Sequence, residues 1–61
     1  MLQHGQEVVV KNGDNTLKAI VQDPREMDGQ IKVSFLRANR FRRTYRMITI
    51  RVRVENILEV L

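Results

Sequence analysis

The chain contains no cysteine and no tryptophan, and its only histidine is His4. Without cysteine, neither a disulfide framework nor a thiolate metal site is available to stabilise so short a protein. One histidine near the terminus forms neither a metal site nor a histidine-based catalytic pair by itself. We therefore expect no metal ion and no other cofactor.

Aromatic residues are also scarce, because the chain has one tyrosine and two phenylalanines. An aromatic cage for methylated lysine or arginine needs several convergent rings, and one of the three, Phe35, is expected in the core. The seven acids are scattered over predicted turns and are not paired in one cleft. Catalysis needs a nucleophile with a base, paired carboxylates or a metal, so we expect that the protein is not an enzyme.

Long apolar stretches are absent as well. No run approaches the roughly 18 residues that span a bilayer, and the start of the chain has no signal-peptide pattern. The chain begins at Met1 without a tag or linker, and its 61 residues leave room for one domain. We expect a complete small gene product that is soluble, cytoplasmic and free of membrane contact. The sequence leaves the oligomeric state open.

Acidic residues are missing from one continuous part of the chain, residues 29–54, which carries eight lysines and arginines. The rest of the chain holds all seven acids and only three bases. Arginine supplies all but one of the eight charges, and its planar guanidinium pairs with phosphate through two hydrogen bonds and stacks on bases. A field this one-sided indicates a polyanionic partner, RNA or DNA. The alternative is that the arginines only solubilise the surface.

Apolar residues alternate with polar ones in several short segments, which is the pattern of strands with one buried face. The segments predicted as strands are residues 6–11, 17–22, 31–36, 47–54 and 57–61. Turn residues separate them at 12–15 and at Asp28-Gly29. Asp23-Pro24 is predicted to end the second strand, because proline donates no ladder hydrogen bond, and residues 25–29 are then a polar connection. A single 3₁₀ turn is expected at Glu55-Asn56.

Five short strands with tight turns and no convincing helix predict an all-β fold, a small five-stranded SH3-like barrel of the Tudor or KOW kind. This barrel is expected to occupy residues 1–61 as a single domain, with a long arginine-rich loop at 37–44. Its core is predicted from the inward positions of the alternation. Those residues are Val8, Val10, Leu17, Ala19, Val21, Ile31, Val33, Phe35, Ile48, Ile50, Val52 and Ile57.

Three motifs follow one another along the chain. They are Gly5-Gln6 with Val8-Val-Val-Lys11, Gly13, Asn15 and Leu17-x-Ala19-x-Val21; then Asp28-Gly29-x-Ile31-x-Val33; then Val52-Arg-Val-Glu-Asn-Ile57. Together they resemble the opening, middle hairpin and ending of the Tudor-like C-terminal domain of the bacterial RNA chaperone ProQ. The resemblance implies a five-stranded barrel in a nucleic-acid-associated, bacterial or phage setting. The chain departs from that family at residues 37–44, where the family has a short turn, and it lacks the large RNA-binding domain found there. No binding site is therefore carried over.

The predicted loop and the strand after it supply nine candidate nucleic-acid-binding residues. They are Arg37, Arg40, Phe41, Arg42, Arg43, Tyr45, Arg46, Arg51 and Arg53. No acid lies within residues 37–46 to pair with the five arginines there, and surface ion pairs with distant acids contribute only about 0–1 kcal/mol each. Binding phosphates would release counterions and give strong, salt-sensitive affinity. A mobile solvated loop is the alternative.

The two aromatic residues of this segment have two possible roles. An exposed ring beside arginines is a platform on which a base stacks. For Phe41 we favour folding back to cover the end of the barrel over stacking, and for Tyr45 both interpretations stay open. Arg51 and Arg53 share a face of their strand if Ile50 points inward, either as an extension of the basic surface or as ordinary solvent-facing positions.

Two functions follow from these patterns. The leading hypothesis is a non-enzymatic nucleic-acid-binding module that prefers RNA and holds phosphates through the arginine-rich loop and the adjoining strand. The alternative is a protein-interaction module, a small subunit of a larger assembly or a phage-encoded adaptor or inhibitor that docks on an acidic partner. Exposed apolar residues would support the alternative, and the candidates are Val9, Ile20, Leu36, Met47 and Leu61.

Overall fold

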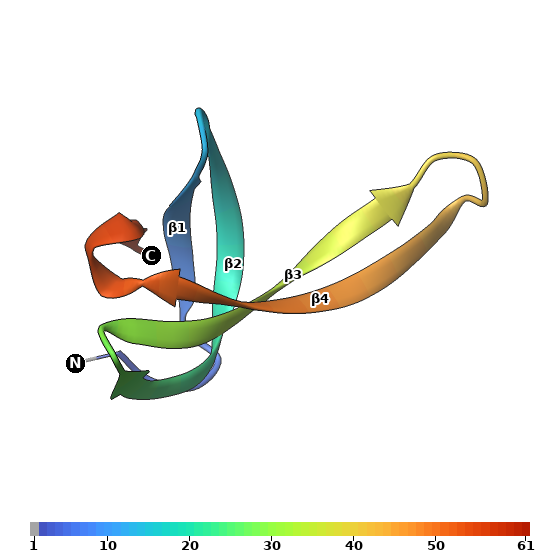
Figure 1. Ribbon diagram of the computed structural model, residues 1–61. Coiled ribbons are helices and arrows are strands. Elements are labelled where there is room, and N and C mark those ends of the chain that lie inside the picture. Colours follow the sequence, from blue (N-terminus) through green and yellow to red (C-terminus); the bar gives the residue numbers. More distant parts are fainter. Residues whose placement is uncertain (1) are drawn as a thin grey trace.

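The computed structural model describes residues 2–61, which form one antiparallel sheet of five strands in the order β4-β3-β2-β1-β5 (Figure 1). The strands are β1 (Glu7–Asn12), β2 (Asn15–Met27), β3 (Gln30–Asn39), β4 (Thr44–Arg53) and β5 (Ile57–Val60). A single 3₁₀ turn, η1 (Val54–Asn56), joins β4 to β5 as predicted, and the described residues contain no α-helix. The all-β prediction is therefore confirmed. No helix in this part of the chain is long and apolar enough to cross a membrane.

Two tight hairpin turns fix the register of the first three strands. Gly13 begins the two-residue turn between β1 and β2 with φ +62°. Asp28 and Gly29 form the turn between β2 and β3, with φ of +54° and +75°. Positive φ at both central positions, as at Asp28-Gly29, is the requirement of a type I′ turn, whereas positive φ at the first position alone, as at Gly13, is that of a type II′ turn. The twist of both turn types matches that of the flanking strands. Both turns lie where the Gly-containing segments predicted them.

The second strand is longer than the sequence suggested. Asp23-Pro24 does not end β2, because Asp23 pairs with Lys32 and Met27 pairs with Gln30 of β3. The register shifts on either side of Asp23. A strand accommodates proline at irregular positions of this kind, because the residue there does not have to donate a hydrogen bond to the neighbouring strand. The predicted polar connection at residues 25–29 is therefore wrong, and only its last two residues form a turn.

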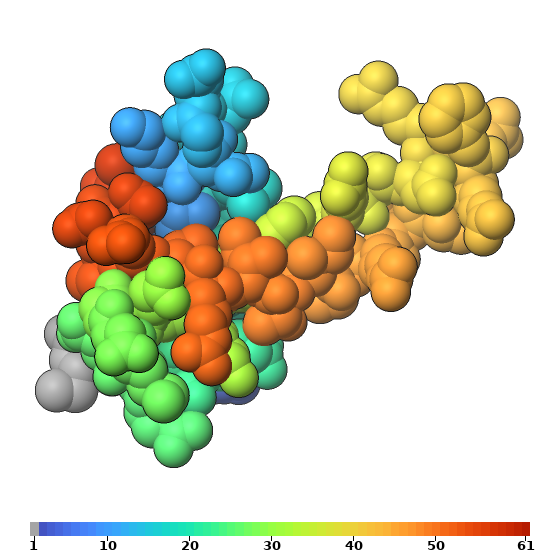
Figure 2. Space-filling model, viewed as in Figure 1, coloured from blue at the N-terminus to red at the C-terminus, as the bar shows by residue number. Residues whose placement is uncertain are grey.

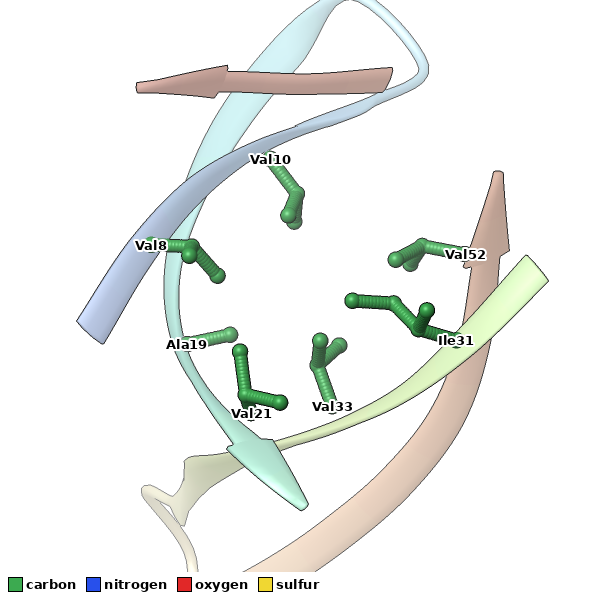
Figure 3. Packing of buried hydrophobic residues seen from close by; sticks show 7 residues of the cluster. All are labelled: Val8, Val10, Ala19, Val21, Ile31, Val33 and Val52. Atoms are coloured by element: carbon green, nitrogen blue, oxygen red, sulfur yellow. The ribbon is translucent and has the colours of Figure 1, made fainter. Parts of the chain in front are cut away.

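The core is a cluster of small apolar side chains that converge from four strands (Figure 3). Its buried members are Val8, Val10, Ala19, Val21, Ile31, Val33 and Val52. All seven were predicted from the alternation. Of the other predicted core residues, Leu17, Phe35, Ile50 and Ile57 pack against the cluster while half-buried. Ile48 is also half-buried but lies farther out along β4.

The sheet bends strongly without closing. Val10 on β1 and Val52 on β4 face the same centre (Figure 3), although three strand pairings separate them in the sheet. In the described residues β4 and β5 are the two edges and are not paired with each other. The amide of Val54 instead donates to the carbonyl of Gly29 (2.9 Å), which holds the start of η1 against the β2–β3 turn. The described sheet is thus curved and open, and the prediction of an SH3-like barrel is not confirmed.

Beyond the core, β3 and β4 continue as a two-stranded ribbon that projects from the body of the protein (Figures 1 and 2). We call residues 36–47 the arm. Pairing continues through Arg37–Arg46, Ala38–Tyr45 and Asn39–Thr44, and every residue of the arm is exposed. The projection raises the radius of gyration to 11.9 Å. A compact chain of this length has about 10.5 Å.

The predicted loop at residues 37–44 is therefore mostly strand. Only residues 40–43 form the turn at the end of the arm. The interruption of the apolar alternation at Arg37 suggested a loop, but backbone pairing between two strands does not require either face to be buried. The alternation ends at this point because the core ends there, while the hydrogen-bonded ladder continues.

Neighbouring positions on β4 test the register of the core. Val52→Asp should place an unpaired carboxylate in the buried cluster and cost more than about 3 kcal/mol, a large part of the stability of so small a domain. Arg51→Asp changes an exposed side chain on the opposite face and should alter the free energy of unfolding by no more than about 0.5 kcal/mol. Urea unfolding of both variants measures the difference. Equal tolerance of the two substitutions would contradict the register.

An ion pair fixes the irregular part of β2. The guanidinium of Arg25 donates from Nε to Oδ1 of Asp23 (3.1 Å) and from Nη2 to Oδ2 (2.9 Å). The backbone amide of Arg25 also donates to Oδ1 (3.0 Å). These hydrogen bonds stabilise the charged carboxylate and lower the pKa of Asp23 from 3.8 to about 2. The same pair raises the pKa of Arg25.

The lowered pKa makes a pH-dependent contribution to stability. Because the pKa of Asp23 is about 2 in the folded protein and about 3.9 in an unfolded chain, the contribution is complete above pH about 4 and is lost as the pH falls through about 2. Carboxyl NMR should show Asp23 titrating near 2 in the wild type and nearer 3.9 in Arg25→Gln. Lys18→Gln, which leaves this pair intact, serves as the control. A value near 3.9 in all three proteins would show that the pair does not form in solution.

Candidate nucleic-acid interface

The turn at the end of the arm is held by Asn39. Its Oδ1 accepts hydrogen bonds from the backbone amides of Phe41 (3.1 Å) and Arg42 (3.3 Å). Asparagine commonly caps turns in this way, because its short side chain reaches amides two and three residues along the chain. Arg43 closes the turn with φ +52°, a conformation uncommon for residues other than glycine. Asn39 fixes the path of the tip, a role that we did not predict.

The arm concentrates positive charge that no ion pair among residues 2–61 neutralises. Five arginines lie on it, at positions 37, 40, 42, 43 and 46, and it contains no acid. The ion pairs among the described residues all lie elsewhere, between Lys18 and Glu7 (3.2 Å), Arg25 and Asp23 (2.9 Å), and Arg53 and Glu55 (3.8 Å). None of these ion pairs involves an arginine of the arm.

Cross-strand pairing also brings like charges together. Arg37 and Arg46 lie directly opposite each other in the ladder. Like charges in opposed positions destabilise a two-stranded pairing, and an isolated hairpin is only marginally stable in water. A bound anion placed between the two guanidinium groups would remove this repulsion. The opposed arginines therefore lower the stability of the free arm, and a bound anion would restore it.

The arm has two chemically different faces because paired residues alternate across the ribbon. Arg37 and Arg46 continue the face that carries the core residues Val33 and Ile50, and we call this the inner face. The opposite, outer face carries the pairs Ala38–Tyr45 and Leu36–Met47. Arginine dominates the inner face, whereas large apolar side chains dominate the outer face.

Both aromatic residues of the arm are open to solvent. Phe41 is 100 % exposed at the tip, and Tyr45 is 75 % exposed on the outer face. The favoured prediction that Phe41 covers the end of the barrel is therefore wrong, because the continued strand pairing carries it away from the body. The alternative prediction, an exposed ring among arginines, is the arrangement that the structure shows for both residues.

Two shallow hollows lie at the end of the arm. The residues that line the first and not the second are Arg37, Phe41 and Arg46. The residues that line the second and not the first are Arg43, Thr44 and Tyr45. Ala38, Asn39 and Arg40 line both. Each hollow thus combines one exposed aromatic ring with at least two arginines.

The two predicted site residues at the base of β4 lie apart from the tip. Arg51 pairs with Lys32 and Arg53 pairs with Gln30, and both arginines are exposed on the outer side of the sheet. Lys32 adds a charge there that the candidate set omitted. The pairs Leu36–Met47 and Ser34–Thr49 separate this basic patch from the tip. The structure therefore gives two basic regions on one long hairpin and no continuous stripe.

The segment between the two basic regions contains a buried hydrogen-bonded serine and borders an apolar hollow. The hydroxyl of Ser34 is buried, donates to Oε1 of Gln22 (3.3 Å) and forms a hydrogen bond with the hydroxyl of Thr49 (2.9 Å). Beside it lies a hollow at the foot of the arm, to which Ile20, Leu36 and Met47 contribute apolar surface. These three side chains are 40 %, 64 % and 55 % exposed, as expected from their outward positions in the sequence pattern.

No cluster of three or more histidine, cysteine or acidic side chains that would hold a metal ion occurs among residues 2–61. The side chains of the arm offer positive charge, hydrogen-bond donation by guanidinium groups and two rings for stacking.

Comparison with known protein families, with curated proteins and with solved structures finds no match.

Proposed function

We propose that the protein is a non-enzymatic nucleic-acid-binding module that contacts phosphates through the arm and the adjoining part of β4. The observation that carries this proposal is a projecting ribbon on which every residue is exposed, five are arginine and none is acidic. A polyanion is the ligand that supplies several negative charges along one line. Nucleic acid supplies in addition the bases on which Phe41 and Tyr45 would stack.

The energetics favour a polyanion over intramolecular pairing. Each arginine–phosphate contact releases condensed counterions, so several contacts give an affinity that depends steeply on salt. Guanidinium groups also form two parallel hydrogen bonds with one phosphate. With Arg37 opposite Arg46, binding relieves a repulsion present in the free protein as well as adding contacts.

The fold supports the same proposal in a coarser way. The five strands follow the order β4-β3-β2-β1-β5 in one curved sheet, and a 3₁₀ turn joins β4 to β5. We propose that this sheet is an SH3-like fold of the Tudor or KOW kind with an enlarged β3–β4 hairpin. The preference for RNA rests on the resemblance to the Tudor-like domain of ProQ, so the binding test includes DNA as well as RNA.

Protein docking remains the second candidate because of one observation. The hollow at the foot of the arm exposes Ile20, Leu36 and Met47, an apolar surface rimmed by the Lys18–Glu7 ion pair. An apolar centre with a polar rim is the anatomy of a protein interface. An acidic protein would occupy this hollow and the arginines together, and it would bind in the absence of nucleic acid.

The arm proposal predicts a specific salt dependence. Four to five phosphate contacts on single-stranded RNA imply a slope of log K against log salt of roughly −3. The double variant Arg42→Ala/Arg46→Ala should bind all sequences more weakly, with a slope shallower by about 1.4, because two contacts are lost. Titration of labelled RNA and DNA at several salt concentrations measures both quantities. The fold should survive, since both arginines are fully outside the core.

A charge-matched control separates local contact from general attraction. Lys11→Ala/Lys18→Ala lowers the net charge by the same amount but changes the β1–β2 hairpin, so its salt slope should stay near that of the wild type. Equal effects of the two double variants would show that binding reflects net charge alone. Absence of RNA and DNA binding at low salt by the folded protein would favour the protein-docking candidate.

A further inference from the structure

Some of the side chains that distinguish the two hollows at the tip belong to different faces of the ribbon. Arg37 and Arg46, which line the first hollow, lie on the inner face. Tyr45, which lines the second, lies on the outer face. The two hollows adjoin, because Ala38, Asn39 and Arg40 line both. The tip therefore offers two neighbouring surfaces of similar composition.

Each surface carries the same chemical combination. Phe41 in the first hollow is fully exposed, and Tyr45 in the second is mostly exposed. Arg37 and Arg46 flank the first ring, and Arg43 flanks the second. A ring for a base and a guanidinium for its phosphate are the parts of a single-strand binding site. The arm presents this set once in each hollow.

A ligand that uses both surfaces must have two backbones and unpaired bases. A lone single strand that stacks on the ring of one hollow leaves the ring of the other hollow unused. An intact duplex offers base edges in its grooves, while the faces of its bases are already stacked on one another. Where a duplex opens into two unpaired tails, both requirements are met. One tail passes along each hollow, and an unstacked base is available to each ring.

We propose, on the basis of the nucleic-acid-binding function above, that the arm recognises a fork, the junction at which a duplex opens into two single strands. The tip lies between the two tails. Phe41 stacks on a base of one tail and Tyr45 on a base of the other. Arg40, which lines both hollows, lies at the branch point, where the phosphates of the two strands diverge. The concentration of charge at the tip matches the high density of phosphates at such a junction.

The test compares three labelled RNAs with the whole protein: a fork with two oligo-uridine tails, a blunt duplex of the same paired sequence, and one oligo-uridine strand. The fork should bind about tenfold more tightly than either of the others, because it engages a second stacking site. Phe41→Ala and Tyr45→Ala should each weaken fork binding about tenfold. The conservative variants Phe41→Tyr and Tyr45→Phe keep a ring and should retain the wild-type affinity for the fork.

Binding of the single strand gives the sharper comparison. One strand can use either hollow, so each alanine variant should keep single-strand affinity within about twofold, and only the double variant should lose it. On the fork the two losses should instead add. Because both rings are exposed, thermal unfolding should give the same midpoint for all variants and the wild type.

The possible failures are distinct. Equal affinities for fork and single strand, or a loss on the single strand in each alanine variant, would overturn the fork proposal and leave nucleic-acid binding in place. Tighter binding of the blunt duplex than of the fork would also overturn it, in favour of insertion into a groove. No binding of any of the three RNAs, or of the corresponding DNAs, would overturn both this proposal and the proposed function.

Discussion

The small volume of the core is the constraint on which the rest of this structure depends. Seven side chains, most of them valine, fill one centre between four strands, and a chain of 61 residues has no apolar surplus to build a second. The curvature of the sheet follows, since a flat sheet would leave these side chains without neighbours on one side. The projection of the arm is a second consequence of the small core. Past Phe35 and Ile48 there is no body left for β3 and β4 to cover, so they extend into solvent as a pair.

The proposed binding surface consists of residues that lie outside this small core. Residues that do not serve the core are free to carry charge, and the arm carries five arginines without a single internal partner among the described residues. Ribbon geometry then distributes them over both faces and the tip. A site of this kind needs no cleft, because the ligand is expected to surround the arm. In the proposed function, the two exposed rings at its end would stack on bases while the arginines hold phosphates.

How much of this was predictable depends on whether a residue contacts the core. The alternation around Val8, Val33 and Val52 predicted the buried cluster, because burial imposes period two on a strand. The arm shows no such alternation, because neither of its faces is buried. Its paired strands were therefore predicted to be a loop. The continuation of β2 past Pro24 depends on a shifted register opposite Lys32, which only the partner strand reveals. The exposure of Phe41 could not be derived because it follows from the projection of the arm.

The position of β4 at the edge of the sheet gives its arginines a second consequence. A ten-residue edge strand presents unpaired amides and carbonyls, and on this one Tyr45 and Met47 add exposed apolar surface. Such an edge is a template for addition of strands from other copies of the protein, which is the first step of aggregation. Arg46, Arg51 and Arg53 repel the same strand of an approaching copy. The same arginines would therefore serve both resistance to aggregation and the proposed attraction of nucleic acid, so that removing one of them would weaken both.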